Sequence, residues 1–137
     1  MVALEPEHVA LSLPFATTSA AIARNQIRTW LAEHQVAVNL DDDFVEDSRL
    51  VVSELVGNAV RHAEPLADGT MVVAWCSCEE GLDISVTDGG APTRPTLVRA
   101  GASSLGGRGL GIVSQLSKRW WLESSRGGST VHAMLAN

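Results

Sequence analysis

Three polar side chains in the middle of the chain have the types and spacing of a catalytic row. Glu54, Asn58 and His62 follow one another at intervals of four residues, and on an α-helix each such step advances about 6 Å along one face. The carboxylate of Glu54 can accept a proton from a hydroxyl or a water molecule. The amide oxygen of Asn58 is a hard ligand for Mg²⁺, and His62 can donate to a phosphate. An ordinary solvated helix face, with His62 as a cation at the helix end, explains the same row.

A second candidate begins at Asp88, which is followed by two glycines. A carboxylate at this position can accept hydrogen bonds from an exocyclic amine such as that of adenine. The glycines allow a flat ring to approach the backbone closely. An ordinary turn would have the same composition, so the motif alone leaves both interpretations open.

A third candidate is the glycine-rich segment 106–111, which leads directly into an apolar helical pattern. The free backbone N–H groups at a helix start and the positive end of its dipole favour a bound phosphate. Arg108 can add a charged donor. A flexible linker explains the glycines nearly as well, but it does not require Leu110, Ile112 and Val113 to begin packing at once.

The elements that must position these residues follow from hydrophobic periodicity. Strands are predicted at 8–14, 70–78, 82–87, 120–125 and 129–135, and helices from a cap at Thr17 or Thr18 to about 35, from 41–43 to about 63, and over 110–116. The glycine-rich stretch at about 89–109 is predicted to be a lid. This order favours an α+β fold, a two-layer α/β sandwich in which three helices cover one face of a mostly antiparallel sheet.

Composition limits the classes of protein and of partner. A chain of 137 residues that is 45% hydrophobic and 19% charged fits a single domain, 1–137. The net charge of −6 disfavours a nucleic-acid partner. No apolar run approaches the ~20 residues of a membrane span, and the first ten residues do not form a secretory signal. We therefore expect a cytoplasmic protein with no membrane or nucleic-acid partner.

Other chemistries are disfavoured by spacing. Cys76 and Cys78 share one face of a predicted strand, and the four histidines are scattered, so we expect two reduced thiols and no zinc site. A P-loop is missing because the single lysine, Lys118, is followed by arginine. Trp120 and Trp121 are adjacent in a strand, so they cannot both face the core.

Three motifs, in this order, resemble the nucleotide-binding boxes of the GHKL ATPase superfamily, which includes DNA gyrase and the histidine kinases. They are ELVGNAVRH at 54–62, VTDGGAP at 86–92 and GGRGLGIV at 106–113. The short lid and the closing GGSTVHAML at 127–135 are most similar to the anti-sigma-factor serine/threonine kinases of actinobacterial type. The resemblance extends over about residues 8–136 and implies the Bergerat fold, the histidine-kinase-like ATPase fold.

Carried onto this sequence, the resemblance implies a role for each motif residue. It makes Glu54 the general base, Asn58 the Mg²⁺ ligand and Asp88 the residue that reads adenine. Gly90 lies in the first turn of the lid, and Thr130 matches a strand threonine that helps to hold adenine. The resemblance places Gly107, Gly109 and Gly111 at the phosphates. We expect His62, Arg108 and Leu110 to complete the set of nucleotide-binding residues.

The activity implied by the resemblance is that of an ATP- and Mg²⁺-dependent serine/threonine protein kinase. It would phosphorylate an anti-anti-sigma factor of the STAS type and sequester a sigma factor. A histidine kinase would also carry a dimerisation helix pair upstream, which the few residues before the first helix do not provide. The alternative function is a non-catalytic ATP-binding module that binds partner proteins, and the presence of both Glu54 and Asn58 argues against it. A scaffold that binds no nucleotide is a third interpretation, and a homodimer is left open.

Overall fold

A single antiparallel sheet organises the chain. The computed structural model describes residues 8–34, 42–90, 110–125 and 127–136. The five strands are β1 (His8–Pro14), β2 (Thr70–Cys78), β3 (Gly81–Asp88), β4 (Arg119–Ser125) and β5 (Gly128–Leu135). They lie in the order β1-β2-β3-β5-β4, and every neighbouring pair is antiparallel. The prediction of a mostly antiparallel sheet is confirmed.

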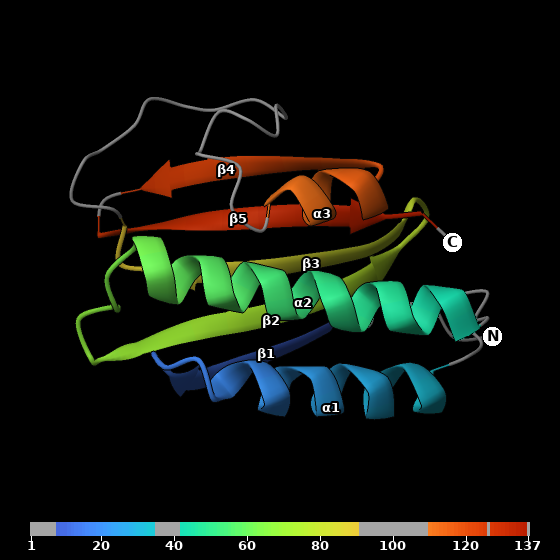
Figure 1. Cartoon of the computed structure of the whole chain (residues 1–137), viewed down its shortest axis with the longest axis horizontal. Coiled ribbons are helices and arrows are strands. Elements are labelled where there is room, and N and C mark those ends of the chain that lie inside the picture. Colours follow the sequence, from blue (N-terminus) through green and yellow to red (C-terminus); the bar gives the residue numbers. More distant parts are fainter. Residues whose placement is uncertain (1–7, 35–41, 91–109, 126, 137) are drawn as a thin grey trace, which may run out of the picture.

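Three helices cover one face of this sheet (Figure 1), and none of the described helices lies on the other face, called the open face below. They are α1 (Ser19–Glu33), α2 (Asp42–His62) and α3 (Leu110–Leu116). The central helix, α2, contacts α1, α3 and the middle strand β3. The fold is therefore the predicted α+β sandwich. Among the described segments, no helix combines the length and the apolar character that crossing a membrane requires.

Alternation along the strands explains why the core lies on the helix side. In β3, Leu82, Ile84 and Val86 are buried and belong to the core, because side chains two residues apart share a face. The same rule separates the adjacent tryptophans at the start of β4. Trp120 is 2% exposed and packs in the core, whereas Trp121 lies on the open face against His132.

The start of α1 differs from the prediction of a threonine cap. Thr18 occupies the cap position, but its side chain makes no capping hydrogen bond. The first amides of the helix are satisfied by a preceding turn instead, since Ser19 donates to the carbonyl of Ala16 and Ala20 to that of Thr17. The buried Ser19 hydroxyl donates to the carbonyl of Pro14 at 2.7 Å. A hydroxyl that ties the helix to the end of β1 therefore takes the place of the expected cap.

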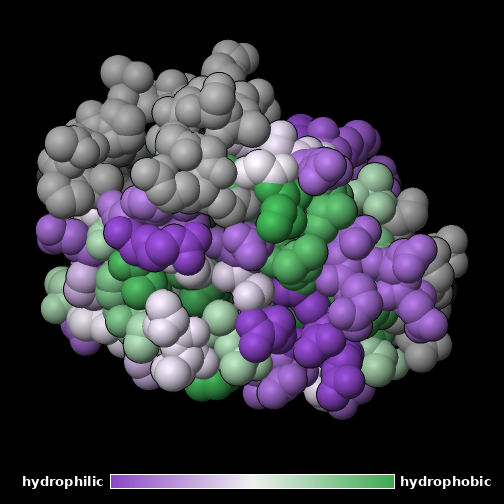
Figure 2. Space-filling model, in the orientation of Figure 1, coloured by the Kyte–Doolittle hydropathy of each residue, from purple (hydrophilic) through white to green (hydrophobic). Residues whose placement is uncertain are grey.

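Most apolar side chains of the helices are buried, and few large ones reach the surface. A hydrophobic patch lies over α2 and α3 on the helix-bearing side, surrounded by hydrophilic residues (Figure 2). The large hydrophobic side chains with the greatest exposure among the described residues are Ile22, Leu50 and Ile112. Ile22 and the fully buried Ile27 lie on the same helix, which allows a direct test of the packing of α1.

Replacing Ile27 by alanine is expected to lower the free energy of unfolding, measured by urea denaturation, by about 2–5 kcal/mol, because the lost methyl groups leave a cavity. The matched control is Ile22→Ala on the same helix, where the side chain is 43% exposed. We expect this control to change the unfolding free energy by less than ~0.5 kcal/mol. Equal losses in the two variants would contradict the described orientation of α1.

Candidate functional site

The predicted polar row lies on α2, and its three members differ in exposure. Glu54 is half-buried, Asn58 is buried and His62 is exposed in the last turn of the helix. The neighbours Leu55 and Ala59 belong to the core, so the row borders the apolar stripe. The helix starts with Asp42 and Asp43 and ends with Arg61 and His62, which is the charge distribution that stabilises a helix dipole.

Asn58 is the most unusual member of this row. Its side-chain oxygen Oδ1 is buried and has no hydrogen-bond partner among the described residues. Leaving a buried acceptor unsatisfied costs about 1–3 kcal/mol. An amide oxygen is a hard ligand, and Mg²⁺ commonly takes one or two protein oxygens together with phosphates and waters. The unpaired oxygen therefore fits a ligand of the Mg²⁺–phosphate kind.

Asp88 is a buried carboxylate at the end of the central strand. It is 5% exposed, and it shares the helix-side face of β3 with Val86 and Ile84 because the three lie two residues apart. Its Oδ1 accepts hydrogen bonds from the amide of Gly90 at 2.7 Å and from the hydroxyl of Ser129 at 3.2 Å. These two donors fix the orientation of the carboxylate before any ligand arrives.

Backbone contacts hold the end of α2 against the end of β3. The amide of Gly89 donates to the carbonyl of Glu64 at 2.7 Å, and the amide of Glu64 donates to the carbonyl of Gly90 at 2.9 Å. A Cβ atom on Gly89 would collide with the carbonyl of Pro65. Glycine at position 89 is therefore required by this close approach, and the approach keeps the exit of α2 beside Asp88.

The structure separates the predicted Thr130 from Asp88. Thr130 pairs with Thr87 in the sheet register, and the two hydroxyls hydrogen-bond at 2.8 Å on the open face. The residue opposite Asp88 is Ser129, which is buried and donates to the carboxylate. Because adjacent strand residues point to opposite faces, Ser129 rather than Thr130 lies beside Asp88.

The sequence analysis missed Ser129 and the role of Gly128. A Cβ atom on Gly128 would collide with the carbonyl of Asp88, so the glycine permits β5 to approach the end of β3. The signal was present in the pair Gly128-Ser129 immediately before Thr130. Which of the two adjacent hydroxyl residues faces Asp88 depends on the strand register, which this sequence does not specify by itself.

Only part of the predicted phosphate segment can be placed. Leu110 and Gly111 begin α3, where Leu110 is fully buried in the core and Gly111 borders open space. The side chain of Leu110 therefore serves packing, and any contact with a ligand would come from its backbone. The predicted residues Gly107, Arg108 and Gly109, and all of the predicted lid (about 89–109) beyond Gly90, lie outside the described residues. Gly90 has a φ of 94° and forms the turn after Asp88, in which its amide donates to the Asp88 carboxylate.

Comparison with models of known protein families gives a match to the histidine kinase-like ATPase domain over residues 15–135. The matched range includes all three helices, four of the strands and every residue assigned above to the site. A search of curated proteins finds no match.

Replacing Gly89 by alanine is expected to lower the free energy of unfolding by about 1–3 kcal/mol, because the new methyl group must displace backbone at Pro65. Gly111→Ala is the matched control, since a Cβ atom there meets nothing within 4 Å. Alanine in a helix is favoured over glycine, so this control is expected to gain up to ~1 kcal/mol. Urea denaturation measures both values, and unchanged stability of Gly89→Ala would disprove the close approach.

Proposed function

The chain belongs to the histidine kinase-like ATPase domain family, and from that premise we propose that it is an ATP- and Mg²⁺-dependent serine/threonine protein kinase of the anti-sigma-factor type. Family membership implies that the domain binds ATP. The protein acceptor we propose is an anti-anti-sigma factor of the STAS type, and the kinase, when it is free of this unphosphorylated partner, would sequester a sigma factor. Placement in the cytoplasm and assembly as a homodimer are parts of this proposal.

The observation that carries the proposal is the presence of two buried polar groups where α2 meets the end of β3. Asn58 lies four residues, or about 6 Å along the axis, before His62 at the end of α2, and Glu64 follows two residues after that end. Glu64 in turn is bonded to the backbone that follows Asp88. A buried amide oxygen without a described partner and a buried, pre-oriented carboxylate support a site that binds the two ends of one nucleotide.

Asp88 is the residue that we assign to recognition of the nucleobase. Its Oδ1 is already engaged by Gly90 and Ser129, and an ionised carboxylate has further acceptor capacity for an exocyclic amine. Burial at 5% exposure strengthens such a hydrogen bond, because water does not compete for it. An amine on the base, as in adenine, suits this acceptor, whereas a carbonyl oxygen at the same position would be repelled.

Glu54 and Asn58 are the groups we assign to the reaction. Asn58 would hold Mg²⁺ through Oδ1, and the bound ion would supply neutralisation of phosphate charge. Glu54 lies one helical turn away, half-buried, where its carboxylate would orient the acceptor hydroxyl and take up its proton as the phosphoryl group is transferred. Catalysis would rest mainly on positioning, since phosphoryl transfer demands little covalent chemistry from the protein.

The choice of partner is supported by the resemblance of the three motifs and of the closing segment 127–135 to anti-sigma-factor kinases. It has no further support from the geometry of the described residues. The competing function, a module that binds ATP and partners without phosphoryl transfer, shares the nucleotide site but makes no use of Glu54. Two substitutions therefore test the proposal at different levels.

Asp88→Asn is expected to weaken ATP binding by ~1.5–3 kcal/mol, the value of a charge-assisted hydrogen bond. The reason is that the NH2 group of asparagine would face the exocyclic amine of adenine, and both groups are hydrogen-bond donors. Calorimetric titration with ATP in excess Mg²⁺ measures the change. The matched control is Asp83→Asn, the same substitution on the same strand but on the open face, which is expected to leave the affinity unchanged. Equal affinities of the Asp88→Asn variant and the parent would remove Asp88 from the site.

Glu54→Gln is expected to abolish most phosphoryl transfer while leaving ATP affinity nearly unchanged, because only the proton acceptor is lost. The assay follows labelled phosphate from ATP to a purified STAS-type partner, and general-base catalysis typically contributes 10²–10⁴-fold in rate. Glu46→Gln, on the exposed side of the same helix, is the control. Full transfer by Glu54→Gln would exclude Glu54 from the mechanism, and no transfer by the parent protein would favour the binding module.

A further inference from the structure

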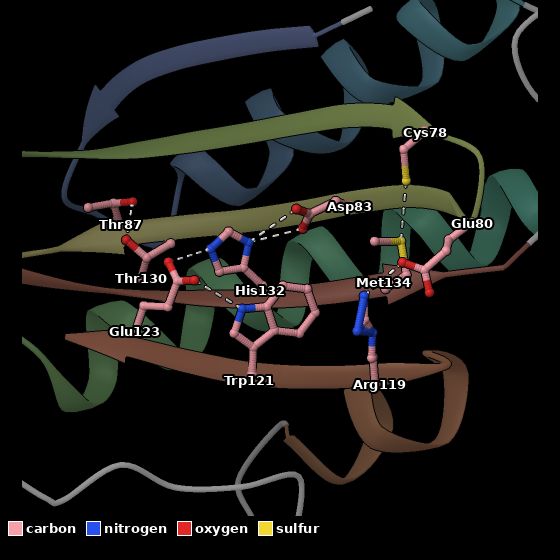
Figure 3. A network of polar contacts seen from close by, with 10 residues as sticks. All are labelled: Cys78, Glu80, Asp83, Thr87, Arg119, Trp121, Glu123, Thr130, His132 and Met134. Carbon is pink, nitrogen blue, oxygen red and sulfur yellow. Dashed lines mark hydrogen bonds and ion pairs between the residues drawn. The ribbon is translucent and has the colours of Figure 1, made fainter. Parts of the chain in front are cut away.

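A polar cluster occupies the open face of the sheet, away from the nucleotide site. It consists of side chains from three adjacent strands, with His132 of β5 at its centre (Figure 3). Asp83 comes from β3, and Trp121 and Glu123 come from β4. Alternation places all four on the face opposite Asp88 and the core. The proposed function uses none of them.

Both ring nitrogens of His132 face carboxylates. Nδ1 lies 3.1 Å and 3.2 Å from the two oxygens of Asp83, and Nε2 lies 3.2 Å from Oε1 of Glu123. An ionised carboxylate only accepts hydrogen bonds, and a neutral imidazole carries a hydrogen on one nitrogen alone. The observed geometry therefore matches the imidazolium form, which donates from both nitrogens at once.

The ring of His132 is held in this orientation by Trp121. The two rings are stacked with centroids 4.7 Å apart and planes 3° from parallel. Trp121 also donates from Nε1 to the second oxygen of Glu123 at 3.3 Å, and the guanidinium of Arg119 lies 4.9 Å from its ring centroid. A rotation of the imidazole would break the stack as well as both hydrogen bonds.

We propose that His132 is a proton-dependent clasp that joins β3, β5 and β4 when it is protonated and releases Glu123, on the edge strand β4, when it is neutral. The bond to Asp83 persists in the neutral form because that carboxylate is the less exposed of the two, with 26% side-chain exposure against 64% for Glu123. β4 carries Trp120 into the core and contacts α3. The proton thus controls how firmly the edge of the sheet is attached.

The charges around His132 support this assignment. Burial alone lowers the pKa of His132, but the hydrogen bonds and negative charges of Asp83 and Glu123 outweigh burial and raise the pKa above its usual 6.5. Cys76, which pairs with Asp83 in the register, stays a neutral thiol because burial raises its pKa. Arg119, whose guanidinium lies over the Trp121 ring, is paired with Glu80 at 2.7 Å.

The sign of the pH effect follows from the raised pKa. The folded state holds the proton more tightly than the unfolded chain, so the stabilisation is complete below about pH 6.5 and is lost as the pH rises through the folded-state pKa of His132. The ratio of folded to unfolded protein is expected to fall over that interval by the ratio of the two proton dissociation constants. This effect requires neither nucleotide nor partner.

The test uses the full chain without nucleotide. Urea unfolding is measured between about pH 6 and pH 9 for the parent, His132→Gln, Glu123→Gln and the control His8→Gln, an exposed histidine of β1 in the same sheet. We expect the parent and His8→Gln to lose stability over this range and His132→Gln to lose much less. The NMR titration of the His132 ring is expected to have a midpoint above 6.5 in the parent and a lower midpoint in Glu123→Gln.

Glu123→Gln alters a largely exposed side chain, so it keeps the test decisive if His132→Gln does not fold. Hydrogen exchange of the β4 amides is expected to accelerate at the high-pH end relative to that of the β2 amides. A His132 midpoint at or below 6.5, or the same loss of stability in His132→Gln as in the parent, would overturn the clasp.

Discussion

The amide of Gly89 bonds to the carbonyl of Glu64 and the amide of Glu64 bonds to the carbonyl of Gly90, so the exit of the central helix and the end of the central strand are joined through backbone. The joint admits no side chain at Gly89, because the carbonyl of Pro65 occupies that space. Since backbone atoms form the joint, it sets the distance between α2 and Asp88 whatever side chains the site carries. The positions of Asn58 and Glu54 relative to Asp88 all depend on it.

Asp88 and Asn58, two buried polar residues at this end of the domain, differ in how their hydrogen bonds are satisfied. The cost of burying the Asp88 carboxylate is offset by hydrogen bonds from Gly90 and Ser129. The Oδ1 of Asn58, in contrast, has no partner among the described residues. A buried polar group without a partner lowers stability, and a ligand that supplies the partner recovers the loss. Strands β3 and β5 also contribute side chains to the His132 cluster on the opposite face, because alternate residues of one strand point to opposite faces.

Hydrophobic periodicity in the sequence predicted the strands and helices to within two residues, because every strand has one buried face. The four-residue spacing of Glu54 and Asn58, and the two glycines after Asp88, indicated these three residues as candidates for the site. The sequence analysis named Thr130 and did not consider Ser129, because the residue that faces Asp88 depends on the β3–β5 register between segments more than forty residues apart. For the same reason the cluster of Asp83, Glu123 and His132 could not be predicted. The predicted threonine cap of α1 was wrong, because the preceding turn supplies the acceptors for the first amides of the helix and Ser19 bonds to the carbonyl of Pro14.

The most direct test of the nucleotide site is a crystal structure of the protein with Mg²⁺ and a non-hydrolysable ATP analogue. The account predicts the exocyclic amine of adenine within hydrogen-bond distance of the Asp88 carboxylate, on the helix side of the sheet, and Mg²⁺ coordinated by Oδ1 of Asn58. A nucleotide bound elsewhere, or adenine on the open face beside Thr130, would contradict it.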